Sequence, residues 1–456
     1  MDRFKFVLQQ ATIVCTALFM VTLVTPALAQ QQEYSLADLL QQALESNHTI
    51  KAQIKELKSK DAAAAGARGL TGPYIEFSGG YQQQGEMTGL IPAHGKTIPA
   101  EFDDVMTSYS LTAKQVLYDA GKTQSLVTFQ HREKDWQRAN VYKEKLVVAG
   151  EVTKSFYRIL QLNDTITAQK EVIDALDAGY GESKLLLDVG RIAEVDVMQV
   201  EAQIAVEKEK LARYEGQLAA QAAALEALLG SDLPERFHLV GRLTDYTLPG
   251  TVSDQSLALN PELAKAKLRQ EQAADLLQAA KADQTVRVTV NGEYSHKFLS
   301  QGSSDEMWII GVQAKWPVFD GGVIAAAIRQ AEGQNEKAAE QVAQVVVDMK
   351  TADTTYRGNQ AAANARVESA RKAWKRADEV YRILKLSYQS GRSSATEMLV
   401  AQATAANAHT AYYQALYDRI EAEVNLAVLH GQMPYDISGE TTTNQQGGKG
   451  NGLFKN

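Results

Sequence analysis

The chain has little cysteine, little proline and no long apolar run. Its 456 residues include nine prolines and a single cysteine, Cys15. One cysteine cannot form an intramolecular disulfide, so the fold must be held by packing alone. The longest apolar run, residues 11–24, is shorter than the roughly 20 residues that a membrane-spanning helix needs. These absences exclude a disulfide-rich domain and a helical membrane protein.

Positive charge is also in short supply. The chain has 47 Lys and Arg against 55 Asp and Glu, for a formal net charge of −8. Proteins that bind nucleic acid usually carry a basic surface, so no DNA or RNA partner is expected.

Groups suited to catalysis are scattered along the chain. No histidine pair has metal-ligand spacing within a helix, and no Ser or Cys nucleophile motif is present. We therefore expect no catalytic residues, no metal and no cofactor, and we do not expect an enzyme. The histidines are His48, His94, His131, His238, His296, His409 and His430.

The first residues have the pattern of an export signal. Arg3 and Lys5 precede the apolar run 11–24, and residues 26–29 close it with an Ala-x-Ala pattern. This order predicts a secretory signal peptide over residues 1–29. Cys15 lies inside it, and the residues before Cys15 do not form a lipoprotein-type cleavage site. We expect an exported chain without cysteine and without lipid.

Three glycine landmarks recur 201 residues later, together with their neighbours, and predict a tandem duplication. The repeats would span 30–232 and 253–432, with a polar linker over 233–252 and a largely disordered tail over 433–456. The recurring pairs are Gly121 and Gly322, Gly190 and Gly391, and Gly230 and Gly431.

Each repeat is expected to contain one helical segment, two strands and two helices. The opening helical segments, 35–66 and 254–282, contain Asn47 and Asn260, which interrupt the apolar pattern and are expected to cap a new helix. The helical segments 121–180 and 322–388 have about 60 residues each, or about 90 Å of helix. No compact globule has this shape.

The strand segments alternate strictly between apolar and polar residues. Val286, Val288 and Val290 alternate with Arg287 and Thr289, and residues 75–82, 105–114 and 308–316 show the same period. Strands of about 11 to 13 residues suit a bilayer crossing better than an average soluble sheet. A soluble hairpin packed on helices stays open as an alternative. Four strands cannot close a membrane barrel, so strands in a membrane would require several chains.

Aromatic residues stand near the strand ends, where an interfacial girdle would lie. They are Tyr74, Phe298, Trp308 and Trp316.

The last helix of each repeat carries a heptad stripe. In the second repeat it runs from Leu399 to Ala427 in steps of four and three, and in the first from Met198 to Glu226 with smaller side chains. This pattern predicts close helix packing. A plain antiparallel coiled-coil stalk would show it too.

In order and in duplicate, these features make the chain resemble the TolC family of outer-membrane efflux proteins. The motifs are the Asp-x-Gly-Gly turn after the second strand and the Gly-Arg turn between two helices, over nearly all of the exported chain. The resemblance implies a mainly α protomer that gives four transmembrane β-strands to a homotrimeric twelve-stranded barrel, continued by a periplasmic α-barrel.

The resemblance also implies a function. The protein would be the outer-membrane exit duct of a tripartite efflux or type I secretion system. It would conduct substrate passively from an inner-membrane transporter through a periplasmic adaptor, with outer-membrane lipid around its strands. A non-channel periplasmic coiled-coil protein, structural or adaptor-like, is the alternative.

Family patterns also suggest roles for particular residues. Glu397 matches an acidic residue that rings the pore, Asp196 is its counterpart in the first repeat, and Tyr388 matches a tyrosine that helps to hold the tip shut. A ring of carboxylates favours cations and can bind a divalent ion. An acid in the first turn of a helix is also favoured by the macrodipole alone. Val400 and Ser393 depart from the family pattern, where a second acid and a gate arginine would stand.

Two sets of turns complete the expected sites. The first set would lie at the tapered tip and dock the adaptor, although a glycine that merely caps a helix is the simpler reading. It comprises Gly190, Arg191, Gly391 and Arg392. The second set joins strands to helices and comprises Asp119, Gly121, Asp320 and Gly322.

Overall fold

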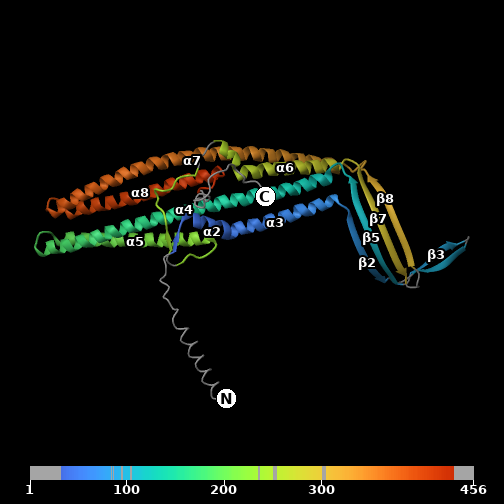
Figure 1. The fold of residues 1–456 in the computed structure, drawn as a ribbon, viewed down its shortest axis with the longest axis horizontal. Helices are drawn as coiled ribbons and strands as arrows, with labels where there is room; N and C mark the ends of the chain where they lie inside the picture. The colour runs from blue at the N-terminus through green and yellow to red at the C-terminus, as the bar shows by residue number, and fades with distance from the viewer. Residues whose placement is uncertain are drawn as a thin grey trace, which may run out of the picture.

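The computed structural model describes residues 32–83, 85, 87–93, 96–102, 105–234, 237–249, 254–299 and 304–435. The predicted signal peptide, 1–29, and residues 436–456 of the predicted tail lie outside this part of the chain. The described chain is long and narrow, with helices along most of its length and a sheet at one end (Figure 1). None of its helices combines the length and the apolar character that a bilayer crossing requires.

The two halves of the chain repeat one order of elements, which confirms the predicted duplication. The first half contains β1 (Gln32–Tyr34), α2 (Leu36–Ser46), α3 (His48–Arg68), η1 (Gly69–Thr71), β2 (Tyr74–Gln83), β3 (Met87–Ala93), β4 (Lys96–Phe102), β5 (Val105–Tyr118), α4 (Lys122–Asp188) and α5 (Glu194–Leu229). The second contains β6 (Phe237–Leu239), η2 (Asp254–Leu259), α6 (Pro261–Ala282), β7 (Arg287–Leu299), β8 (Ser304–Lys315), α7 (Val323–Gln389) and α8 (Ala395–Leu429). Helices α4 and α7 have 67 residues each and extend about 100 Å.

The recurring glycines all have positive φ angles, the region that favours glycine. At Gly230 and Gly431 space is limiting as well. An added Cβ would lie 2.8 Å from the carbonyl oxygen of Ser46 at the first position and 2.7 Å from that of Leu259 at the second. Each glycine therefore lets the end of a repeat approach the backbone at its beginning.

Asn47 and Asn260 cap α3 and α6, as predicted, and each also ties its repeat together. The Asn47 side chain accepts hydrogen bonds from the backbone N–H of Thr49 and Ile50, while its amide donates to the Leu228 carbonyl at 2.8 Å. Asn260 does the same for α6, and its amide donates to the Leu429 carbonyl at 2.6 Å. The sequence predicted the cap but not the second bond.

The strands form an antiparallel sheet in the order β2-β5-β7-β8. One face is apolar and carries a chain of rings, in which Tyr109 lies 6.4 Å from Phe77 and 5.3 Å from His296. The other face is polar, as the Ser78–Ser110 hydroxyl contact of 2.8 Å shows. Within the described residues, the outer edges of β2 and β8 have no neighbouring strand. The segment expected as a long loop over 85–101 contains the hairpin β3–β4.

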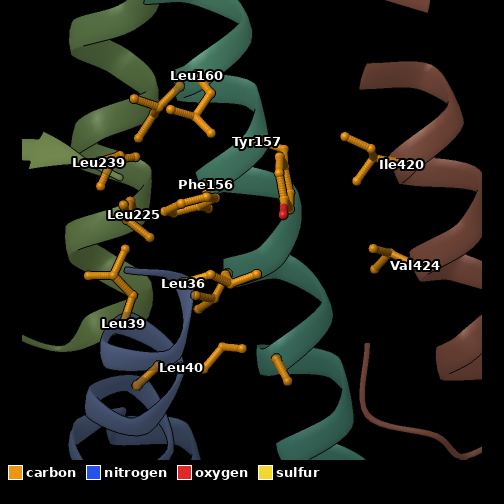
Figure 2. Packing of buried hydrophobic residues seen from close by; sticks show 14 of the residues in the cluster. Leu36, Leu39, Leu40, Phe156, Tyr157, Leu160, Leu225, Leu239, Ile420 and Val424 are labelled. Atoms are coloured by element: carbon orange, nitrogen blue, oxygen red, sulfur yellow. The ribbon is translucent and has the colours of Figure 1, made fainter. Parts of the chain in front are cut away.

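The main hydrophobic core lies near the middle of the long helices. Leu39 of α2, Phe156 of α4 and Leu225 of α5 are buried against one another, and Ile420 of α8 lies on the other side of α4 (Figure 2). This core fixes both repeats to α4.

The stretch between the repeats belongs to this core. β6 pairs in parallel with β1, and Leu239, Leu243 and Tyr246 are buried. The Tyr246 hydroxyl donates to the Pro434 carbonyl at 3.0 Å. Residues 233–252 do connect the repeats, but they are not only the polar linker that composition suggested. Their few apolar residues have no regular period, so the pattern gave no sign of burial.

The helices lie side by side in a single row. Beside the sheet the order is α3, α4, α6, α7, and in the distal half it is α5, α4, α8, α7. One border of the row is therefore α3 and α5, and the other is α7. Helix α7 buries few residues in spite of its length: Ile328, Ala338, Met349, Ala363 and Tyr388.

The two heptad stripes have different surroundings. In α8, Ile420 and Val424 are fully buried, and Gly150 of α4 leaves only 3.0 Å between its potential Cβ and Val428. In α5 the predicted stripe, which includes Met198, is exposed, so that stripe does not pack within the chain. The face that contacts α4 carries Val197, Val200 and Ile204 instead. These branched side chains bury more apolar area than the alanines of the stripe do.

Candidate functional site at the distal end of the helices

The helix pairs α4–α5 and α7–α8 end in two turns of the same geometry. In the first, the N–H groups of Gly190 and Arg191 donate to the carbonyls of Leu187 and Leu186, both at 2.8 Å. The equivalent bonds of Gly391 and Arg392 have the same lengths. This is the Schellman motif, and it needs a left-handed residue, which the φ angles of 74° and 70° at the two glycines supply.

Both turns present an exposed arginine. No ion pair joins Arg191 or Arg392 to the rest of the described chain, and both side chains point away from the core. The distal end therefore offers two free cationic groups on rigid turns. This arrangement suits contact with another protein, and it also suits simple solvation.

Asp196 and Glu397 both occupy the first turn of a helix. Glu397 forms a capping box with Ser394: the Ser394 N–H donates to its Oε2 at 3.0 Å, and its own N–H donates to the Ser394 hydroxyl at 3.2 Å. Asp196 accepts only the Ala193 N–H, at 3.2 Å. Each carboxylate thus helps to start its helix. Glu397 is exposed, so it keeps a charge available to solvent or to an ion.

Tyr388 is the buried member of the predicted set. It is 8% exposed and packs with Leu176, Val200 and Leu399 in a second hydrophobic cluster near the tip. Its hydroxyl lies 3.2 Å from the Ser183 hydroxyl of α4. The residue therefore joins α7 of the second repeat to α4 of the first.

A second contact between the repeats escaped sequence reasoning. The Thr396 hydroxyl donates to the Gln199 side chain at 2.8 Å and joins the first turn of α8 to that of α5. Thr396 directly precedes Glu397, and Gln199 is three residues after Asp196. The available signal was the nearness of both polar residues to the predicted acids.

A shallow apolar groove runs between α7 and α8 beside Glu397. Its exposed floor includes Val380, Leu384 and Val400, and Arg376 and Glu397 lie at its rim. An apolar segment with flanking charges of both signs would fit such a surface.

The strand–helix junctions lie at the other end of the helices, next to the sheet. Burial opposes ionisation of Asp119, but its hydrogen bonds, among them 2.9 Å from the Thr123 N–H, outweigh burial and hold its pKa below the usual value. Asp320 accepts the Ile324 N–H at 2.6 Å and the Gly322 N–H at 2.9 Å, and these bonds also lower its pKa. Both carboxylates cap the long helices. The structure does not bring them to the distal site.

The structure also brings together three residues that the sequence did not connect. His430 is fully buried, with Nδ1 2.6 Å from the Ser256 hydroxyl and Nε2 2.7 Å from the Asp353 carboxylate. The contacts resemble a hydrolase triad, but Ser256 is only 7% exposed and Arg357 holds Asp353 at 2.9 Å. A substrate could not reach this serine, and we regard the cluster as a structural joint. No group of three or more metal-ligating residues occurs in the described chain.

Comparison with known proteins follows the same division of the chain. The family described as outer membrane efflux protein matches residues 39–231 and 252–432. The solvent efflux pump outer membrane protein SrpC of Pseudomonas putida is 24% identical over 429 residues, which are 88% of this chain and 87% of that protein. The toluene efflux pump outer membrane protein TtgI, from another strain of Pseudomonas putida, gives the same values.

Solved structures share the fold. The CmeC outer membrane channel of Campylobacter jejuni has a TM-score of 0.76 at 16% identity, over 89% of this chain and 88% of that one. The MtrE outer membrane channel of Neisseria gonorrhoeae has a TM-score of 0.74 at 17% identity, over 87% and 89%.

Proposed function

The chain belongs to the outer membrane efflux protein family, and from this premise we propose that three copies assemble into one continuous exit duct across the outer membrane. The family consists of channels of efflux systems, and the protein lies in the outer membrane with its helices extending into the periplasm. A periplasmic coiled-coil protein without a channel, the alternative from the sequence, does not agree with this family.

The open edges of the sheet are the observation that carries the trimer. β2 and β8 form the two ends of a four-stranded sheet, and their outer backbone groups lack partners in the described chain. Hydrocarbon does not tolerate unpaired backbone groups, so each β8 must meet the β2 of another copy. Three copies would contribute twelve strands. The apolar face with Phe77 would contact lipid, and the polar face with Ser78 would line the lumen.

The helices support the same assembly. Their single row ends in borders that have no partner in one chain, and α7 buries only five residues. A row of this kind can close into a ring with copies of itself, which would continue the sheet as a long hollow cylinder.

At the distal end we propose the gate. Three Glu397 carboxylates, with three Asp196 nearby, would surround a narrow opening and favour cations. Tyr388 would hold α7 against α4 through Ser183 and keep this end narrow. The turns with Arg191 and Arg392, together with the groove beside Val400, would receive the periplasmic adaptor of an inner-membrane transporter.

Efflux is favoured over secretion of polypeptides. The two curated relatives are named as outer membrane proteins of solvent and toluene efflux pumps, and both match over almost the whole chain. We propose small molecules as the cargo of this duct.

The test is the mass and the single-channel conductance of the detergent-extracted protein. A trimer that gives a small, steady conductance in a planar bilayer, blocked by millimolar Mg²⁺ from one side only, is the expected result. A stable monomer without conductance would contradict the proposal. A trimer that conducts but shows the same block from both sides would remove the acidic gate and leave the duct.

A further inference from the structure

The distal half of the row has two uncovered borders, the outer faces of α5 and α7. Helix α5 contacts α4 through Ile204, and Glu209, five residues later, lies on the opposite side of the helix at 100° per residue. Helix α7 contacts α8 through Trp374, whose ring lies 4.2 Å from that of His409. Lys372 and Leu386 are exposed away from this contact.

The two borders carry opposite charge. Residues 194–222 of α5 include six acidic and three basic residues, whereas residues 361–389 of α7 include seven basic and three acidic residues. The formal net charges are therefore −3 and +4 over segments of equal length, both counted from the distal turns. Complementary charge of this kind favours one specific partner surface and repels like surfaces.

Individual residues match in level as well. Helices α5 and α7 run in opposite directions, so positions equally far from Gly190 and Gly391 lie at the same height. Val195 and Leu386 are each five residues from their glycine, and Glu209 and Lys372 are each nineteen. Both pairs lie on the uncovered borders, and members of each border are spaced by sevens, which keeps them on one face.

Charges on these borders have little to satisfy them within the chain. Glu209 has no ion-pair partner in the described residues. Lys372 lies 3.2 Å from Glu368 of its own helix, but their side chains are 74% and 49% exposed, and such pairs contribute little. The apolar residues Val195 and Leu386 are 56% exposed each.

We propose that α5 of one copy packs against α7 of the next copy, with Val195 beside Leu386 and Glu209 beside Lys372. The inference rests on the trimer proposed above and identifies the seam that closes its distal half. The partner is a second copy of this chain because the two borders complement each other in charge and in level. Such a head-to-tail contact forms a closed ring when the rotation between copies closes.

Cysteine cross-linking tests the seam in the assembled protein. A chain with Val195→Cys and Leu386→Cys should form covalent dimers and trimers under mild oxidation, visible on a non-reducing gel. Each single variant serves as a control, and it also covers Cys15. The pair Val206→Cys and Leu386→Cys is the matched control, because it is displaced by eleven residues, or about 16 Å along the helix, and should not cross-link.

Charge reversal tests the ionic part. Glu209→Lys should slow the Val195–Leu386 cross-link severalfold at low salt, as should Lys372→Glu, and the two together should restore the rate. Glu215→Lys is the control: Glu215 lies 3.6 Å from Lys170 of its own chain, so Lys372→Glu should not compensate for it. At about 1 M salt the Debye length falls to about 3 Å, and the reversals should lose their effect.

The outcomes separate this inference from the proposed function. A conducting trimer without the Val195–Leu386 cross-link would overturn the seam and leave the duct intact. Cross-links to another cellular protein in place of a second copy would assign the border to an adaptor and also overturn it. A chain that is monomeric in detergent would remove both proposals.

Discussion

Glu397 has two physical roles that a single substitution can separate. Its carboxylate caps α8 through the Ser394 N–H, and its charge lies at the proposed gate. Glutamine at the same position keeps an acceptor for the cap and removes the charge. We expect Glu397→Gln to weaken Mg²⁺ block of the channel about tenfold, or about 1.4 kcal/mol, with no change in trimer stability.

Single-channel recording with a Mg²⁺ titration measures this effect. Glu215→Gln, which removes an acid of α5 paired with Lys170, is the control and should leave the block unchanged. An unaltered block in Glu397→Gln would place that residue outside the constriction.

The joint of Ser256, Asp353 and His430 differs between the two repeats. The corresponding residues of the first repeat are Ala43, Val152 and Leu229, and all three are buried and apolar. We expect His430→Leu alone to cost about 1–3 kcal/mol, because it leaves buried polar groups without this partner. The triple variant Ser256→Ala, Asp353→Val and His430→Leu should recover most of the loss.

Thermal loss of helical circular dichroism measures both variants. If the triple variant is less stable than the single one, the polar joint does more than replace an apolar contact of the other repeat.

The same joint predicts a dependence on acid. Burial opposes ionisation of Asp353, but hydrogen bonds from His430 and Arg357 outweigh it and hold its pKa below the usual 3.8. A lowered pKa in the folded protein stabilises the fold above pH 3.8, and this stabilisation is lost as pH falls through the folded value. Thermal scans between pH 3 and pH 7 should show the extra loss below about pH 4 in the wild type, and the triple variant should lack it.

At the scale of elements, the two distal turns depend on glycine for geometry and on open space for contact. We expect Gly190→Asp and Gly391→Asp to abolish cross-linking to the adaptor in cells, because a charged side chain is placed on each docking turn. A non-glycine residue in the left-handed region costs about 1–2 kcal/mol, which the trimer should survive.

Gly181→Asp is the matched control for both variants. Gly181 lies within the distal part of α4, with no atom near its potential Cβ. If adaptor cross-linking survives both turn substitutions, these turns are not the docking site.

Sequence patterns predicted those elements whose periodicity is set by one buried face. The strands around Val288 and the long helices after Gly121 and Gly322 lie where alternation and glycine spacing placed them. The same logic misassigned the stripe of α5, because a heptad does not tell which partner covers it: Met198 faces away from the chain, and Val200 faces α4. Burial of Tyr246 gave no periodic signal at all.

The candidate site shows the same limit. Adjacent motifs located the turns at Gly190 and Gly391 and the acids that follow them. Contacts between distant segments, such as Thr396 with Gln199 or His430 with Asp353, depend on how the repeats meet. A single repeat does not contain that information, although alignment of the two repeats locates Asp353 and His430 as polar substitutions in a core.

At the scale of the whole molecule, the sheet should distinguish its two faces. Phe77 lies on the apolar face and Ser78 on the polar one. We expect Phe77→Arg to reduce the amount of trimer in the outer membrane, since an arginine facing lipid near the midplane costs about 2–4 kcal/mol. Ser78→Arg should assemble normally and change the conductance instead.

Quantitative immunoblots of heated and unheated outer membranes would show the difference in trimer. Equal trimer levels in the two variants would mean that the apolar face does not contact lipid.

The place of the core along α4 makes each distal half a lever. From Leu160 at the edge of the core to Asp188 at the end of α4 is about 42 Å of unbroken helix. A swing of about 5° about that point moves the tip by about 4 Å, which is more than the diameter of a water molecule. The distal aperture is therefore set by the angle at which two helices leave a small apolar fulcrum, and a side chain such as Phe156 acts on it from a distance.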